Sequence, residues 1–180
     1  MRNLVDQLSN YADYHRDARN VATHFVGIPM IVVGVAVLLS RPTASPEWLG
    51  SVAMSPALAL VVATSVYYLV LDLRFGLAMA ALLGLALWAG QWAAAQETWV
   101  WLGWGLGPFI AGWAIQFVGH VFEGRKPAFV DDLMGLIIGP LFLVAEAAFA
   151  GGLRGEVHSE IAKRLDRLPV PKRRQATSAA

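Results

Sequence analysis

Residues 21–40, VATHFVGIPMIVVGVAVLLS, form an apolar block without a formal charge. Twenty such residues in an α-helix span about 30 Å, which is the thickness of a bilayer's hydrocarbon core. Similar blocks follow at Leu49 to Leu71, Phe75 to Ala95 and Trp99 to Phe122. A spanning segment must satisfy its own backbone hydrogen bonds, and no strand alternation competes here. The sequence therefore predicts an all-α integral membrane bundle with four transmembrane helices.

The amino-acid composition excludes several kinds of functional site. The 180 residues are 57% hydrophobic and include no cysteine, so disulfides, thiolate nucleophiles and sulfur-ligated clusters are excluded. Any bound metal must use imidazole, carboxylate or amide ligands. The first block begins after twenty polar and amphipathic residues and lacks a small-residue cleavage site, so we expect it to remain as a helix. No phosphate-binding loop, hydrolase elbow or dinucleotide fingerprint occurs, and no nucleic-acid partner is expected.

The basic residues predict the orientation in the membrane. All except Arg41, in the first connection, lie before the first block, in the second and fourth connections and near the C-terminus: Arg2, Arg16, Arg19, Arg74, Arg125, Lys126 and the seven from Arg154 to Arg174. By the positive-inside rule, these segments face the cytoplasm. Four crossings satisfy the rule, whereas a fifth would place the most basic segment outside.

A fifth, less regular apolar block runs from Phe129 to Gly151. It carries Asp131, Asp132 and Glu146 and is interrupted by the pair Gly139-Pro140. We expect two short helices that enter and leave the membrane on the cytoplasmic side, joined at this pair. A simple fifth span is the alternative.

Amphipathic segments are expected at both ends of the chain. Apolar residues recur at helical spacing in both: Leu4, Val5, Leu8, Tyr11 and Ala12, then Val157, Ile161, Leu165 and Leu168. Both helices are predicted to lie along the cytoplasmic interface. We expect one membrane-embedded domain over residues 1–155, followed at 156–180 by an amphipathic helix and a basic, disordered tail, PVPKRRQATSAA.

The first polar motif is YHRDARNVATHFVGIP at residues 14–29. On one unbroken helix with about 100° per residue, His15 and His24 point in opposite directions. Asp17, Asn20 and His24 share a face of that helix. A metal held by both histidines therefore requires a bend between them. Asn20 is the predicted place, because its amide can cap a new helix.

The second polar motif is WAIQFVGHVFEGRKPA at residues 113–128. Gln116, His120 and Glu123 are spaced at i, i+4 and i+7, so they project from one face of the fourth helix. A histidine beside a carboxylate can hold a metal or orient another ligand. Arg125 is a candidate for receiving a substrate carboxylate, although a basic residue in a short loop is ordinarily a positive-inside residue.

His15, His24 and His120 fall at the same predicted membrane face although they are far apart in sequence. A single histidine near a helix end is ordinarily an interfacial or capping residue. Three at one depth, with Glu123, Asp17 and Asp132 near the same plane, predict a metal site. His158, in the amphipathic tail, is interpreted as a surface residue.

The fourth block is rich in glycine. We expect Gly103, Gly105, Gly107 and Gly112 to form packing surfaces between helices rather than binding loops.

The two histidine motifs, together with DDLMGLIIGPLFLVAE at residues 131–146, resemble a small family of membrane 2-hydroxy fatty acid dioxygenases, which includes the yeast enzyme of phytosphingosine breakdown. The resemblance runs from about Tyr14 to Phe149. It implies a ferrous-iron (Fe2+) enzyme that converts a long-chain 2-hydroxy fatty acid and dioxygen into a fatty acid one carbon shorter. It also implies that His15, His24 and His120 are iron ligands or their immediate supports.

A 2-hydroxy acid can chelate iron through its carboxylate and hydroxyl, and three protein ligands leave room for dioxygen. We expect the acyl tail to lie in the apolar bundle among membrane lipid, in the inner membrane of a bacterium or the endoplasmic reticulum of a eukaryote. No oligomeric state is assigned. A di-iron desaturase is disfavoured, because four histidines are too few. The non-enzymatic alternative is a membrane scaffold or transporter that binds lipid head groups.

Overall fold

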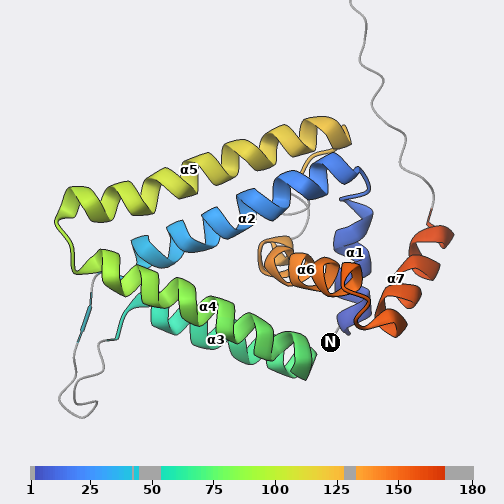
Figure 1. Cartoon of the computed structure of the whole chain (residues 1–180), viewed down its shortest axis with the longest axis horizontal. Helices are drawn as coiled ribbons and strands as arrows, with labels where there is room; N and C mark the ends of the chain where they lie inside the picture. Colours follow the sequence, from blue (N-terminus) through green and yellow to red (C-terminus); the bar gives the residue numbers. More distant parts are fainter. Residues whose placement is uncertain (1–2, 42, 45–53, 128–132, 169–180) are drawn as a thin grey trace, which may run out of the picture. The chain divides into compact units, whose positions relative to one another are not determined.

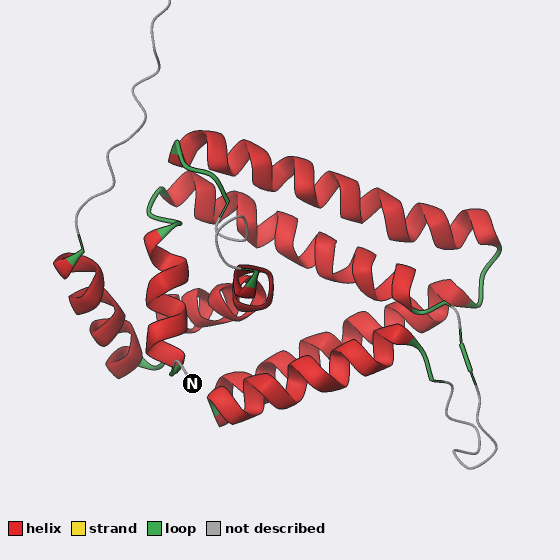
Figure 2. Ribbon diagram, turned by 180° about the vertical axis from the view of Figure 1, so that it is seen from behind, coloured by secondary structure: helices red, strands yellow, loops and turns green. Residues whose placement is uncertain are grey.

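The structure is a computed structural model that describes residues 3–41, 43–44, 54–127 and 133–168 (Figure 1). Every regular element in these ranges is an α-helix, and Ala44 and Met54 form an isolated antiparallel bridge (Figure 2). The helices are α1 (Leu4–Asp13), α2 (Ala18–Leu39), α3 (Pro56–Leu71), α4 (Leu73–Ala94), α5 (Thr98–Glu123), α6 (Met134–Ala150) and α7 (Gly155–Arg167). The all-α prediction is confirmed for this part of the chain.

The chain divides into two compact units. The first unit combines residues 1–25 with residues 115–180, and the second unit consists of residues 26–114. The first unit thus contains α1, the start of α2, the end of α5, α6 and α7.

Three of the described helices are long and apolar enough to cross a membrane. They are α2 with 22 residues, α4 with 22 and α5 with 26. The helices α6 and α7, bent by 112° relative to each other, make a fourth candidate if they are counted as one span. The apolar helix α3 has 16 residues, and the start of the predicted second block at Leu49 lies outside the described residues.

In the second unit, α3 and α4 form a tight hairpin around one residue, Asp72. Its backbone N–H donates to the carbonyl of Tyr68 at 2.9 Å and ends α3. Its carboxylate accepts the N–H of Phe75 at 2.9 Å and begins α4. A Cβ at Gly76 would lie 2.6 Å from the Cα of Leu69, so glycine is what allows the two backbones to approach this closely.

Glycines also bring α2 and α5 together within the second unit. A Cβ at Gly34 would lie 2.8 Å from the carbonyl oxygen of Gly105, and one at Gly112 would lie 2.6 Å from that of Gly27. The prediction of packing surfaces is thus confirmed at Gly105 and Gly112. It is wrong at Gly103 and Gly107, where an added Cβ would meet nothing within 4 Å.

In the first unit, α1 packs against α6 and α7. Its N-terminus is closed by a capping box, in which Asn3 and Asp6 exchange hydrogen bonds of 2.8 and 3.0 Å. The apolar face predicted from the sequence is largely buried: Leu4, Leu8, Tyr11 and Ala12 are each less than a tenth exposed. The α7 helix buries Val157 and Ile161 in the same way, so the predicted helices are confirmed at both ends. Leu168 follows the end of α7 and is 42% exposed, so the predicted apolar face does not extend to it.

The predicted break at Gly139-Pro140 is wrong. The α6 helix runs continuously from Met134 to Ala150 with Pro140 inside it. A proline inside a helix removes one backbone hydrogen bond, and apolar helices tolerate this loss when neighbouring helices cover the freed carbonyl. Helices α2 and α5 also contain a proline each, Pro29 and Pro108. The bend lies instead between α6 and α7. The acids Asp131 and Asp132 and the tail PVPKRRQATSAA lie outside the described residues.

Candidate metal site

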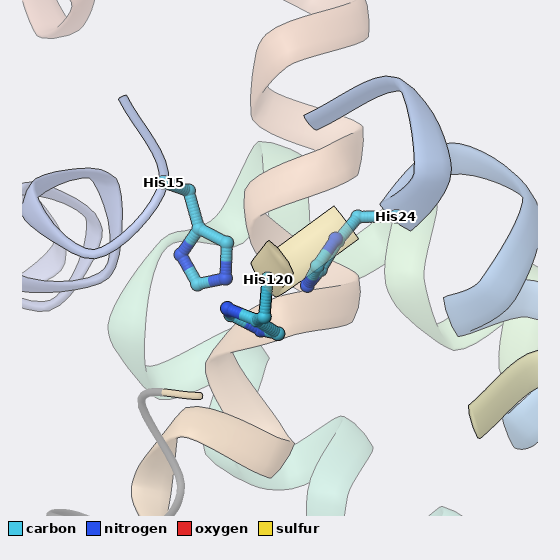
Figure 3. A group of neighbouring side chains, drawn as sticks. All are labelled: His15, His24 and His120. Atoms are coloured by element: carbon cyan, nitrogen blue, oxygen red, sulfur yellow. The ribbon is translucent and has the colours of Figure 1, made fainter. Parts of the chain in front are cut away.

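The imidazole rings of His15, His24 and His120 meet inside the first unit (Figure 3). One ring nitrogen from each lies within 4.8 Å of the corresponding atoms of the other two, and all three side chains are buried. The ring centroids are 4.6 Å apart for His15 and His24, 5.3 Å for His15 and His120, and 5.1 Å for His24 and His120. The sequence prediction that these three residues gather is therefore confirmed as geometry.

His15 reaches the cluster because the chain turns directly after α1. The N–H groups of Tyr14 and His15 donate back to Tyr11 and Ala12 at 3.1 and 3.0 Å and close the last helical turn. The His15 ring then folds back over α1. It stacks on Tyr11, with the ring centroids 4.0 Å apart and the planes 9° from parallel.

Hydrogen bonds to backbone carbonyls determine which ring nitrogens of His15 and His24 remain available to a metal. The Nδ1 atom of His15 lies 2.8 Å from the Tyr11 carbonyl oxygen, and Nδ1 of His24 lies 2.8 Å from the Asn20 carbonyl oxygen. A carbonyl only accepts, so Nδ1 carries the proton in both rings and the lone pair remains on Nε2. Both Nε2 atoms are buried without a hydrogen-bond partner in the described residues.

Protonation of His15 is unfavourable in this environment. Burial, followed by the nearby imidazole of His24, lowers the pKa of His15 to about 3. The ring is therefore neutral at physiological pH. Neutral imidazole is the form that ligates metals.

His24 is placed by the first turns of α2. The predicted bend between the two histidines exists, but the cap is not Asn20. Asp17 directly precedes the helix, and its carboxylate accepts the backbone N–H of Arg19 at 3.0 Å. Asn20 lies inside α2, and its side-chain amide donates to Glu123 at 3.0 Å. Both residue types cap helices well, so local sequence did not distinguish them.

His120 is placed by close packing of α5 against the start of α2. A Cβ at the preceding residue, Gly119, would lie 2.0 Å from the hydroxyl oxygen of Thr23 and 2.5 Å from Oδ1 of Asn20. Only glycine fits at this contact. The Nδ1 atom of His120 is a third buried ring nitrogen without a hydrogen-bond partner in the described part of the chain.

The other predicted site residues lie around the cluster in different ways. Gln116 is buried one helical turn before His120. The carboxylate of Asp17 pairs with Arg19 at 2.8 Å. Arg125 donates through Nη1 to the carbonyl oxygen of Asp13 at 2.7 Å, and its guanidinium lies 4.5 Å from the centre of the Tyr14 ring.

His158, interpreted from sequence as a surface residue, lies apart from the three-histidine group. Its ring stacks on Phe149 in the first unit, with the centroids 4.7 Å apart. It is not a member of the metal-ligating group found among the described residues.

Three residues near the cluster were not predicted as part of the site: Tyr11, Thr23 and Gly119. Tyr11 is four residues before His15, which is the spacing of stacked neighbours on a helix, and this signal was available in the sequence. Thr23 donates to the Asn20 carbonyl at 2.6 Å, the same oxygen that accepts from His24. The roles of Thr23 and Gly119 depend on which helix packs beside each of them, and the sequence does not show this.

The cluster fits a metal ion. Buried polar atoms are ordinarily hydrogen-bonded, and three unsatisfied imidazole nitrogens in one place call for an explanation. Two ring nitrogens that bind one ion at about 2.1 Å each lie at most about 4.2 Å apart. The candidate nitrogens lie within 4.8 Å of one another, so small ring rotations would bring them to a common ion. Three neutral imidazoles suit a first-row transition metal and leave further coordination positions open.

Comparisons with known proteins give independent information. The family model described as "2-hydroxy-palmitic acid dioxygenase Mpo1-like" matches residues 1–150. The 2-hydroxy-palmitic acid dioxygenase MPO1 of Saccharomyces cerevisiae is 33% identical over 156 residues, which cover 83% of this chain and 82% of the yeast protein. No solved structure matches the chain. The matched region of the family model contains all three histidines.

Proposed function

We propose, from the finding that this chain belongs to the Mpo1-like family of 2-hydroxy-palmitic acid dioxygenases, that it is an iron(II)-dependent enzyme of fatty acid α-oxidation. Its substrates are a long-chain 2-hydroxy fatty acid and dioxygen. Its products are the fatty acid one carbon shorter and the former carboxyl carbon, released at the oxidation level of CO2 together with water. His15, His24 and His120 hold the metal in this proposal.

One observation supports the proposal most strongly. Three buried histidines present ring nitrogens to one point, and none of these nitrogens has a hydrogen bond within the described residues. Ferrous iron bound there would supply positions for a chelating hydroxyl and carboxylate and would activate dioxygen. The four electrons that reduce dioxygen would come from the substrate's own C1–C2 and C2–H bonds, so no nicotinamide or flavin is required.

The chain's own groups prepare the site. Hydrogen bonds to the carbonyls of Tyr11 and Asn20 keep the His15 and His24 protons away from the metal position. Arg125 remains the candidate for the substrate carboxylate. Both hydrogen bonds that it makes to Asp13 use Nη1, and its side chain is 26% exposed.

The membrane setting suits a long acyl chain. Several large apolar side chains on α5 near His120 are exposed, including Phe117, Val118 and Val121. In lipid such a surface is stable, and it gives the acyl tail an apolar path beside the histidines. The positive-inside rule predicts the cytoplasmic face for the end of α5 and the start of α2.

The proposal is tested with purified protein in detergent. The metal-free protein is titrated anaerobically with Fe2+, and oxygen uptake and acid products are then measured with 2-hydroxypalmitate. We expect stoichiometric iron, oxygen consumption and a C15 acid, with no turnover of palmitate, which lacks the hydroxyl. Failure to bind any transition metal under anaerobic conditions would favour the non-enzymatic scaffold or transporter.

A further inference from the structure

The carboxylate of Glu123, the last residue of α5, is bound by three N–H donors from the start of the chain. Its Oε1 accepts the backbone N–H of Arg16 at 3.1 Å. Its Oε2 accepts the backbone N–H of Asp17 at 2.9 Å and the side-chain amide of Asn20 at 3.0 Å. These donors belong to the turn between α1 and α2 and to the first turn of α2. More than a hundred residues separate each of them from Glu123 in the sequence.

The three donors lie beside the three histidines. Arg16 directly follows His15, Asn20 lies four residues before His24, and Glu123 lies three residues after His120. One carboxylate thus joins the backbone segments that carry all the candidate ligands. Hydrogen bonds from several N–H groups to an ionised carboxylate are stronger than neutral ones, which makes this connection rigid.

The same bonds leave Glu123 poorly placed as a metal ligand. Its Oε2 accepts two hydrogen bonds, which use both lone pairs of that oxygen, and its Oε1 accepts one, so a single lone pair remains. The group of potential ligands found among the described residues consists of the three histidines without Glu123. Glu123 therefore contacts the protein segments around the site rather than the site itself.

We infer that Glu123 is a positioning residue: its carboxylate acts as a clamp that holds the α1–α2 turn against the end of α5 and so brings His15, His24 and His120 together before metal binds. The clamp is a property of the metal-free protein. Its consequence for iron rests on the proposed function. Supporting groups of this kind typically change metal affinity by about 10- to 100-fold when they are removed.

The test is the substitution Glu123→Gln. Glutamine has nearly the same shape, but its amide NH2 faces at least one N–H donor whichever way it is turned, so one acceptor is replaced by a repulsive donor. The matched control is Glu156→Gln, the same chemical change at a residue of α7 whose side chain is 71% exposed. Asn20→Ala is the milder second variant, because it removes one of the three donors.

Two measurements are made on each variant. Hydrogen exchange of the Arg16 and Asp17 amides in the metal-free protein reports the clamp directly, and we expect about tenfold faster exchange in Glu123→Gln. Anaerobic Co2+ titration reports the site, and we expect about 10- to 100-fold weaker binding with an unchanged absorption spectrum at saturation. Asn20→Ala should show smaller changes of both kinds, and Glu156→Gln should show neither.

The outcomes separate the clamp from other roles. Unchanged exchange and unchanged affinity in Glu123→Gln overturn the inference. An altered Co2+ spectrum at saturation also overturns it, because the carboxylate would then be a ligand. If the unsubstituted protein binds no metal, the proposed function fails, while the exchange measurement still decides whether the clamp exists. If Glu123→Gln does not fold, the same two measurements on Asn20→Ala decide the question.

Discussion

The two compact units of the chain are stabilised by different kinds of contact. Seven of the nine buried polar side chains in the described residues belong to the first unit: Gln7, Ser9, His15, Asn20, His24, Gln116 and His120. The second unit has two, Ser40 and Ser55, and its helices meet through glycines. It also carries most of the exposed large apolar residues, such as Val70, Leu85 and Trp88.

This difference in contacts indicates that the two units have different tasks within one small membrane protein. Apolar helices with close glycine contacts are suited to lipid, where van der Waals packing and small residues drive association. Buried polar groups are costly there and are retained where they serve a site. Substitutions around the three histidines in the first unit should therefore change metal binding, and those at the glycine contacts of the second unit should change stability alone. Four predictions test this division.

The largest expected effect is from His24→Ala. Removing a ligand from a site with three protein ligands should weaken Co2+ or Fe2+ binding by more than about 100-fold, beyond the effect of losing a supporting group. The measurement is an anaerobic metal titration of the purified protein. The control is His158→Ala, which removes a histidine stacked on Phe149 in the same unit and should bind metal normally. Equal metal content in both variants would contradict the three-histidine site.

A smaller effect is expected from Gly119→Ala. The new methyl group would collide with Thr23 and Asn20, so α5 must move away from α2 at the site. Overpacking of this kind costs about 1–3 kcal/mol, and we expect metal affinity to fall by roughly tenfold as well. Gly107→Ala on the same helix, where an added Cβ meets nothing within 4 Å, is the control. Thermal unfolding in detergent and metal titration are measured on both variants, and only Gly119→Ala should lose stability and metal affinity.

The matching change in the second unit is Gly34→Ala. Its methyl group would meet the carbonyl oxygen of Gly105 at 2.8 Å and Cβ of Phe109 at 2.9 Å. We expect a similar loss of stability, about 1–3 kcal/mol, because backbone and Cβ atoms cannot rotate away. Metal affinity should stay within about twofold of the unsubstituted protein. A large loss of affinity would show that the two units are not separate in function.

The smallest effect is expected from Arg125→Lys. Lysine keeps a positive charge beside Asp13 but lacks the second terminal NH2 group of the guanidinium, which could donate to a substrate carboxylate. We expect KM for 2-hydroxypalmitate to rise by about three- to tenfold, as for one lost hydrogen bond with the charge retained, and kcat to change little. Steady-state oxygen uptake measures both constants. A fall in kcat with constant KM would assign Arg125 to the fold around Asp13 rather than to the substrate.

The site was predictable from the sequence to a considerable degree. His15, His24 and His120 were predicted to gather because the charge rule places them at one membrane face. The bend between His15 and His24 followed from their angular separation on a helix. Its location was not predictable, because Asp17 and Asn20 are both good caps and the choice depends on Glu123, a residue distant in sequence.

The amino-acid sequence by itself determined the helical class, the approximate extents of the apolar helices, the amphipathic faces of α1 and α7, and the set of residues able to hold a metal. These properties are local or periodic, so residue type and spacing suffice. Only the tertiary structure decided that α6 continues through Pro140, that Gly119 allows α5 to touch α2, and that Glu123 binds the α1–α2 turn. Each of these depends on partners that are remote in sequence, whose approach is governed by packing and by the need to satisfy buried polar groups.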